Sequence, residues 1–157
     1  MLPFITTHLF VSEFSHSAGG IVLNTHGDVL VVKQRDGSWS LPKGKINPDE
    51  KPQDAAAREI AEESGIRELT FIKLLKSYSR YGVKNTGMED KDRLRRLTFY
   101  LFTTTEKQLR PADSRILEAR WVPQQNVKQL LTHPKDQNFL RMRCRKCGRR
   151  YSWRWLN

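Results

Sequence analysis

The sequence predicts a single α/β domain. Two apolar, β-branched runs, Ser17 to Leu23 and Asp28 to Val32, flank a short polar segment and are typical of two strands joined in a hairpin. A segment rich in alanine, Pro52 to Ser64, has the composition of a helix, and further strand-like runs follow it. At 157 residues the chain is long enough to bury a core without disulfides.

The middle of the chain continues this pattern. The helix is expected to end at Gly65, because glycine readily adopts the left-handed conformation that closes a helix. Leu69 to Tyr81 and Leu97 to Thr103 are rich in aromatic and β-branched residues and are expected to form two paired strands. The polar segment between them, Gly82 to Asp92, is expected to be an exposed loop that contributes to specificity.

The last elements are shorter. Glu118 to Val122 is expected to be a strand, and Gln124 to Leu131 a helix that starts after Pro123. A final helix is expected to begin after Pro134 and to run toward the basic end of the chain.

Composition excludes two broad classes of protein. With 38% hydrophobic and 29% charged residues, the chain is neither disordered by composition nor membrane-like. No apolar run approaches the roughly 20 residues of a membrane-spanning helix, and the first residues lack the basic head and cleavage site of a signal peptide. We therefore expect a protein without a membrane span and with a cytoplasmic location. The sequence does not determine its oligomeric state.

The net charge of +11 is unevenly distributed. After Asn138 there is no acidic residue, and the basic ones are Arg141, Arg143, Arg145, Lys146, Arg149, Arg150 and Arg154. We divide the chain into a domain at residues 1–140 and a basic, aromatic tail at residues 141–157. The tail would suit contact with RNA or another polyanion. The alternatives are a solvated surface and, for Trp153 and Trp155, packing onto the core.

The two cysteines, Cys144 and Cys147, form a C-x-x-C pair within this tail. A structural zinc ion needs about four such ligands, so the pair is half of a site. Three interpretations stay open: reduced thiols without a special role, a metal site shared with another group or chain, and a redox function.

Three glutamates carry the chemistry. Glu59, Glu62 and Glu63 stand at positions i, i+3 and i+4, so they share one face of the expected helix. Adjacent carboxylates repel one another unless a cation neutralises them, and Mg²⁺ or Mn²⁺ prefers such oxygen ligands. A solvated acidic helix face is the alternative when these residues are considered alone.

From Gly44 the chain reads GKINPDEKPQDAAAREIAEESGI. This segment resembles the Nudix box, G-x5-E-x7-R-E-U-x-E-E-x-G-U, where U is aliphatic. The matching residues are Gly44, Glu50, Arg58, Glu59, Ile60, Glu62, Glu63, Gly65 and Ile66, and no position departs from the pattern. Seven fixed identities at fixed spacing arise by chance on the order of once in a billion starting points, so the signal is specific.

The resemblance to Nudix hydrolases implies a fold and a set of roles. The fold is an α/β/α sandwich, a mixed, curved sheet between helices. The implied metal ligands are Glu59, Glu62, Glu63 and the Gly44 carbonyl, with Glu62 alternatively deprotonating water. Arg58 would position a carboxylate, and Glu50 would support the site. The general base varies within the family, and its candidates here are Glu89, Asp90, Asp92 and Glu118.

The residues before the box bear on the substrate. Trp39-Ser40-Leu41-Pro42-Lys43-Gly44 resembles the diadenosine and diphosphoinositol polyphosphate hydrolases and the mRNA-decapping enzymes. Lys43 and Lys45 would then counter the charge of a long phosphate chain; the alternative is two ordinary surface lysines. Tyr81 is a candidate for stacking on a base, and Arg95 for binding a distal phosphate, although such residues more often belong to the core or to a solvated surface.

The expected function is Mg²⁺-dependent hydrolysis, with Mn²⁺ as a substitute metal, of a phosphoanhydride bond in a dinucleoside polyphosphate such as diadenosine tetraphosphate. One alternative is removal of a cap or triphosphate from an RNA 5′ end, which the basic tail would suit. The other is a non-catalytic RNA-binding module, which the retention of every box glutamate disfavours.

Overall fold

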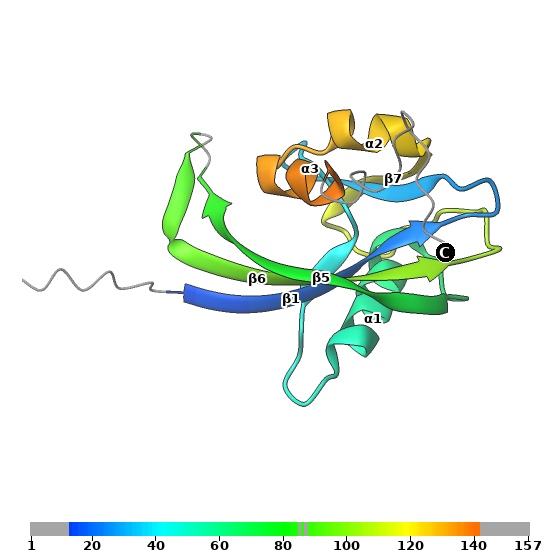
Figure 1. Cartoon of the computed structure of the whole chain (residues 1–157), viewed down its shortest axis with the longest axis horizontal. Helices are drawn as coiled ribbons and strands as arrows, with labels where there is room; N and C mark the ends of the chain where they lie inside the picture. Colours follow the sequence, from blue (N-terminus) through cyan, green and yellow to red (C-terminus); the bar gives the residue numbers. More distant parts are fainter. Residues whose placement is uncertain (1–12, 85, 87, 142–157) are drawn as a thin grey trace, which may run out of the picture.

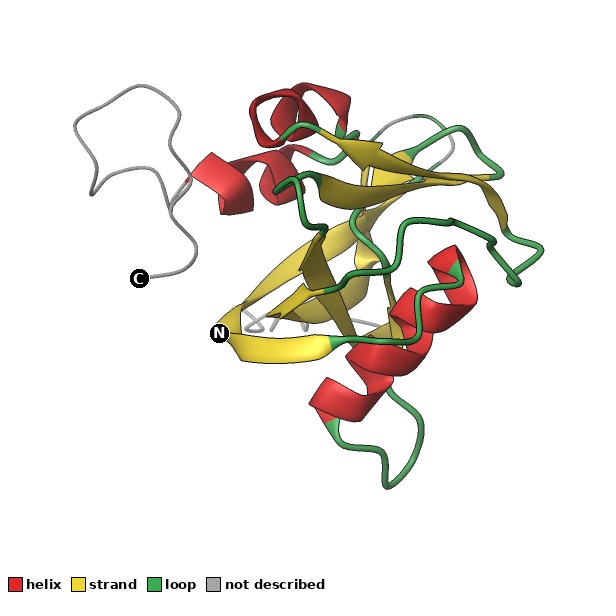
Figure 2. Ribbon diagram, turned by 90° about the vertical axis from the view of Figure 1, so that its right-hand side faces the viewer, coloured by secondary structure: helices red, strands yellow, loops and turns green. Residues whose placement is uncertain are grey.

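The computed structural model of the protein describes residues 13–84, 86 and 88–141 (Figure 1). A seven-stranded sheet has helix α1 (Pro52–Ser64) on one face and helices α2 (Gln124–Leu130) and α3 (Pro134–Arg141) on the other (Figure 2). The expected sandwich with a mixed, curved sheet is confirmed. Apart from Arg141, which ends α3, the predicted tail and its two cysteines lie outside the described residues.

One parallel pairing organises the sheet. The strands are β1 (Glu13–Leu23), β2 (Val29–Gln34), β3 (Trp39–Ser40), β4 (Lys43–Lys45), β5 (Thr70–Val83), β6 (Glu89–Thr103) and β7 (Ile116–Val122). Their order is β3-β2-β1-β6-β5, with β4 beside β1 and β7 beside β2. Strand β1 runs parallel to β6 from end to end, whereas the other pairings among the described strands are antiparallel.

Most of the expected elements are confirmed. The first hairpin joins β1 to β2, and the Asn24 side chain holds its turn by accepting the backbone N–H groups of His26 and Asp28, each at 2.9 Å. Helix α1 has the predicted bounds, and Gly65 closes it at φ +85° while donating its N–H to the Ala61 carbonyl. The later strand and the two C-terminal helices lie within one or two residues of their predicted positions.

The predicted specificity loop from Gly82 to Asp92 is wrong for most of its length. Strand β5 continues to Val83 and β6 already begins at Glu89, so only a short connection remains between them. The charged residues at the start of β6 are in a strand because Glu89 and Asp90 pair with Val83 and Gly82 of β5, and from Arg93 onward the strand also pairs with β1. These strands project beyond the helices as a curved arm (Figure 1), and three register shifts between β5 and β6 accompany the curvature.

The core lies on both faces of the sheet. On the face covered by α2 and α3, which we call the α3 face, the buried cluster includes Ile21, Leu97, Phe99, Val127 and Phe139. On the opposite face, the α1 face, it includes Ala18, Val22, Ala56, Ile60 and Phe102. Successive strand residues therefore alternate between two packed layers. None of the helices in the described part of the chain has the length and apolar character needed to cross a membrane.

Gly65 offers a test of how α1 is held. A Cβ at this position would lie 2.6 Å from the Arg110 carbonyl oxygen, whereas Gly37, at the similar φ of +84°, has no atom within 4 Å of its added Cβ. Both alanine variants would strain the backbone, but only Gly65→Ala would also push on a neighbour. We expect Gly65→Ala to lower the free energy of unfolding by about 1–2 kcal/mol more than Gly37→Ala in chemical denaturation. Equal losses would contradict this close packing.

Candidate active site

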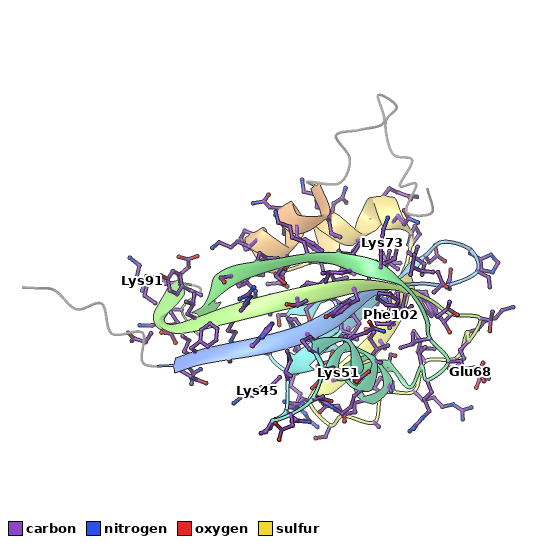
Figure 3. The ribbon with its side chains drawn as sticks, turned by 60° about the horizontal axis from the view of Figure 1, so that its bottom comes forward. Lys45, Lys51, Glu68, Lys73, Lys91 and Phe102 are labelled. Atoms are coloured by element: carbon purple, nitrogen blue, oxygen red, sulfur yellow. The ribbon has the colours of Figure 1, made fainter. Side chains whose placement is uncertain are left out.

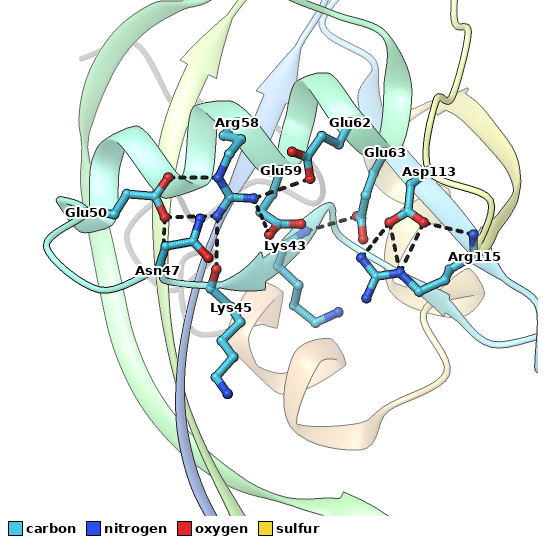
Figure 4. A network of polar contacts seen from close by, with 10 residues as sticks. All are labelled: Lys43, Lys45, Asn47, Glu50, Arg58, Glu59, Glu62, Glu63, Asp113 and Arg115. Carbon is cyan, nitrogen blue, oxygen red and sulfur yellow. Dashed lines mark hydrogen bonds and ion pairs between the residues drawn. The ribbon is translucent and has the colours of Figure 1, made fainter.

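Helix α1 directs two of its glutamates inward and leaves the third near the surface (Figure 4). Glu59 and Glu63, one turn apart, are each only 4% exposed. The side chain of Glu62 is 46% exposed. Carboxylates are seldom buried to this degree unless they are paired or bind a cation. The two inner carboxylates are therefore the first candidates for function.

Both ends of α1 are anchored by loops. Before the helix, the Asn47 N–H donates to Glu50 Oε2 at 2.9 Å. At the other end, the Arg110 N–H donates to the Ser64 carbonyl at 2.7 Å, and the N–H groups of Ala112 and Asp113 donate to the Glu62 carbonyl at 2.9 Å. The last carbonyls of a helix need such partners because the helix itself supplies none. The glutamates thus project from a helix that is held at both termini.

Gly44 lets the Glu59 carboxylate approach the backbone of β4. A Cβ on Gly44 would lie 1.9–2.1 Å from the carboxylate atoms of Glu59. No side chain can be accommodated there while Glu59 keeps this position. The requirement for glycine in this part of the sequence is therefore one of space between β4 and α1.

Arg58 donates hydrogen bonds to four residues around the site. Its Nε and Nη2 donate to the two oxygens of Glu50 at 2.8 and 2.9 Å, and Nη1 donates to Glu59 Oε1 at 2.7 Å. Nη2 also reaches the Lys45 carbonyl at 3.0 Å, while Glu62 Oε2 is more distant at 3.3 Å. The Arg58 hydrogen bonds are the main reason that the pKa of Glu50 falls to about 2. Glu50 therefore stays ionised and fixes the guanidinium.

Glu63 lies in a different electrostatic setting. Its Oε2 accepts the Lys43 backbone N–H at 3.1 Å. The pKa of Glu63 is raised to about 7, chiefly by burial. The charge and the backbone N–H of Lys43 lower this pKa, whereas the charges of Glu59 and Asp113 raise it. Without a cation, Glu63 is therefore easier to protonate than an ordinary glutamate.

An acidic residue that no sequence pattern predicted lies beside this pair. Asp113 lies next to Glu63, and its carboxylate is bound by Arg115, with Nη2 2.7 Å from Oδ2 (Figure 4). Asp113 belongs to the irregular segment between β6 and β7, where no hydrophobic period or motif marks a residue. The hydrogen bonds of this segment to the end of α1 and to Arg35 hold it at the site.

The donor set suits a hard divalent cation. Glu59 Oε2 is buried and has no hydrogen-bond partner among the described residues, although its twin Oε1 is bound by Arg58. Carboxylate oxygens beside a backbone strand are the ligands that Mg²⁺ or Mn²⁺ prefers. Within the described ranges, no three acidic, histidine or cysteine side chains converge as a complete metal site. Glu62 contacts Arg58 instead, so Glu59 and Glu63 are the two carboxylates that already lie where they could bind such a cation.

The predicted substrate residues fall on different faces of the sheet. The register between β1 and β4 pairs Lys43 with Gly19 and Lys45 with Ser17, on the α3 face. Arg95 pairs with Ser15 and lies on that same face. Tyr81 pairs with Leu94, one residue out of phase, and therefore belongs to the α1 face. The structure brings the three cations together on one face and leaves Tyr81 on the other.

The acidic candidates for the general base are dispersed, and Tyr78, another tyrosine of β5, belongs to the core. Tyr78 packs in the core, stacked on Phe99 with ring centroids 6.0 Å apart. Glu118 is on β7 and is paired with Arg120 at 2.7 Å. The remaining general-base candidates lie at the start of β6, on the projecting arm, and are Glu89, Asp90 and Asp92.

Comparisons with known proteins agree with this geometry. The family model described as NUDIX domain matches residues 14–142. An RNA pyrophosphohydrolase of Bartonella tribocorum is 40% identical over 73 residues, which are 40% of this chain and 42% of the relative. A putative 8-oxo-dGTP diphosphatase of Bacillus subtilis is 43% identical over 53 residues, or 33% and 36% of the two chains. The matched region therefore spans well under half the length of these relatives.

Solved structures agree on the fold. An Ap4A hydrolase of C. elegans superimposes with a TM-score of 0.66 at 18% identity, covering 81% of this chain and 93% of the other. A MutT protein of Methanosarcina mazei has a TM-score of 0.63 at 21% identity, with coverages of 83% and 93%. At such low identities these similarities establish the architecture alone.

The raised pKa of Glu63 should make the metal-free protein less stable at high pH. Because its pKa is about 7 in the folded state and near 4.5 otherwise, stability falls as pH rises through this window and is then constant. The free energy of unfolding should fall by roughly 2–3 kcal/mol over this range, and Glu63→Gln should abolish the fall. Denaturation in a chelating buffer at pH 5 and pH 8 measures it.

The half-exposed Glu62 provides the control for this effect. Glu62→Gln should change the difference in stability between pH 5 and pH 8 much less than Glu63→Gln does. If Glu63→Gln and the unmodified chain lose the same stability over this range, burial is not what governs the Glu63 carboxyl.

Proposed function

The chain belongs to the Nudix domain family, and we propose that it is a hydrolase that cleaves a phosphoanhydride bond in a nucleoside polyphosphate with Mg²⁺ or Mn²⁺. The observation that carries the proposal is the pair of buried carboxylates, Glu59 and Glu63, held against β4, with one Glu59 oxygen that has no hydrogen-bond partner in the described part of the chain. Burying two such groups without a counter-charge is costly. A divalent cation at this point offsets that cost.

In the proposed site, Glu59, Glu63 and the Gly44 carbonyl would hold the metal. Glu62, which is exposed and contacts Arg58 at 3.3 Å, would be either a further ligand or the group that accepts a proton from water. Arg58 keeps Glu59 in place through its 2.7 Å hydrogen bond and is itself fixed by Glu50. Arg58 and Glu50 are therefore positioning residues and transfer no proton.

The reaction is the addition of water to one phosphorus of the anhydride. The bridging oxygen leaves with the other phosphate, and the water gives up one proton. A bound Mg²⁺ ion would neutralise charge on the phosphate oxygens and make water easier to deprotonate. Among the chain's own groups, Glu62 is the proposed proton acceptor, because it is the exposed carboxylate of the three. Asp113, beside Glu63, is the second candidate for this role.

A dinucleoside polyphosphate is the substrate that we propose first. Lys43 and Lys45 flank Gly44 and face the same side of the sheet, where they can bind phosphates adjacent to the scissile bond. The Trp39-to-Gly44 segment, with its resemblance to diadenosine polyphosphate hydrolases, supports the same class. The similarity to the C. elegans Ap4A hydrolase supports only the shared fold.

RNA carrying a 5′-triphosphate or cap is the second candidate substrate. The observation that favours it is the 40% identity to an RNA pyrophosphohydrolase, over 73 residues. A screen of dinucleoside polyphosphates, nucleoside triphosphates, nucleotide sugars and 5′-triphosphorylated or capped RNA, each with Mg²⁺ and Mn²⁺, separates the two. If no substrate in the screen is hydrolysed, the chain is a binding module and the proposal fails.

Glu63→Gln should lower turnover on the preferred substrate by about a hundredfold or more, because one ligand charge is lost from the metal site. The measurement is product release at saturating Mg²⁺. The control is Glu68→Gln, which changes an exposed glutamate just beyond α1 and should have little effect. Near-normal turnover by Glu63→Gln would remove Glu63 from the site.

Lys43→Ala should discriminate substrates by phosphate number. We expect a loss in kcat/KM of about tenfold or more on a four-phosphate dinucleotide, from one missing charged contact. A nucleotide sugar, with two phosphates, should lose less. Lys51→Ala removes an exposed lysine next to α1 and serves as the charge-matched control. Equal losses on both substrates would make Lys43 a structural residue.

A further inference from the structure

Two arginines face each other on the α3 face of the arm. The antiparallel register between β5 and β6 places Arg80 directly opposite Arg95. The Cβ atoms of such cross-strand partners are about 5 Å apart, and like charges in this position destabilise a sheet. A bound anion between the two guanidinium groups would turn this repulsion into attraction.

Arg80 is buried but only loosely paired. It is 7% exposed, and its partner Asp136 of α3 is 2% exposed. The Arg80 Nε and Nη2 atoms lie 3.2 and 3.4 Å from the two Asp136 oxygens, and Nε has no aligned acceptor among the described residues. Arg58, in contrast, binds Glu50 at 2.8 and 2.9 Å. Arg80 therefore retains hydrogen-bonding capacity inside the protein.

Asp136 cannot neutralise this region alone. It also accepts the Tyr78 hydroxyl at 2.7 Å, so its oxygens are shared between two donors. That hydroxyl bond and the ion pair fasten α3 to β5. Asp136 thus both holds α3 in place and balances part of the charge of Arg80.

Lys43 adds a third positive charge. It shares the α3 face with Arg80 and Arg95. Burial lowers the pKa of the Lys43 ammonium; the charges of Glu63 and Asp136 oppose this lowering, and those of Arg80 and Arg95 add to it. The Lys43 Nζ donates to the Ser40 hydroxyl at 3.2 Å. The basic side chains of Lys43, Arg80 and Arg95 therefore lie around the single carboxylate of Asp136. On the side of α1, this group borders Glu63.

We propose that Arg80, Arg95 and Lys43 form a phosphate-binding site that is separate from the carboxylates of α1. Guanidinium groups bind phosphate oxygens in a bidentate manner, and an ammonium group adds a point charge. The site extends from Lys43, whose backbone contacts Glu63, to Arg95 on the arm. It therefore selects chains of three or more phosphates over diphosphates, and this assignment to substrate rests on the proposed function.

The experiment measures binding of inorganic tripolyphosphate to the full chain in a chelating buffer, where no metal contributes. Arg95→Ala should weaken binding about tenfold or more, as expected for one charged phosphate contact. The matched control is Arg96→Ala: Arg96 is also exposed, but it pairs with His16 and Ser79 on the α1 face. This control should change affinity by less than about twofold. Pyrophosphate should bind more weakly than tripolyphosphate.

Two results would overturn the site: no measurable tripolyphosphate binding by the unmodified chain, or equal weakening by the two arginine variants. The second would mean that only net charge matters. Hydrolysis is tested separately. If tripolyphosphate binding depends on Arg95 but no substrate is cleaved, the phosphate site stands and the proposed activity fails. If cleavage occurs and Arg95→Ala binds tripolyphosphate normally, the activity stands and the phosphate site fails.

Discussion

Two carboxylates that are kept out of water against the backbone of β4 constrain much of this structure. Glu59 and Glu63 are each 4% exposed, and burying a charged group is unfavourable unless something compensates for its lost hydration. Gly44 makes the contact possible by having no side chain. Arg58 satisfies one Glu59 oxygen, and the Lys43 N–H satisfies one Glu63 oxygen. The remaining demand for positive charge is the physical basis of the proposed metal site.

The short strand β4 joins two functional layers because strand residues alternate between faces. Gly44 faces α1 and receives the Glu59 carboxylate, while Lys43 and Lys45 face the opposite side of the sheet. Three consecutive residues thus contribute to an acidic layer and to a basic one (Figure 4). A phosphate chain bound at this edge would meet cations from one face and carboxylates from the other.

Helix α3 has a different relation to the proposed chemistry from that of α1. It contributes Phe139 and Leu140 to the core and Asp136 to the pairing with Arg80 and Tyr78. Helix α3 therefore holds the arm of β5 and β6 in place near the proposed phosphate-binding site. The tip of the arm, near the labelled Lys91, lies far from α1 (Figure 3). The same contact that fastens the helix also orients one arginine of the proposed phosphate site.

The sequence by itself determined the parts that depend on local spacing. The interval between Gly44 and Ile66 identified helix α1, its end at Gly65 and the three glutamates on one face, because a helix places residues three and four apart side by side. Apolar, aromatic and β-branched runs located the first hairpin, most of β5 and β7, and the second half of β6. This interpretation failed at the start of β6, where charged residues form a strand through their pairing with β5 and, from Arg93 onward, with β1.

Only the tertiary structure decided how the distant residues combine. The parallel pairing of β1 with β6 joins segments about 80 residues apart, and its register puts Arg95 on the α3 face. The pairing of β5 with β6 adds Arg80 to that face and puts Tyr81 on the other. A shift of one residue in either register would reverse these assignments. Asp113 lies beside Glu63 because its loop binds the final carbonyls of α1, a contact that no local pattern encodes.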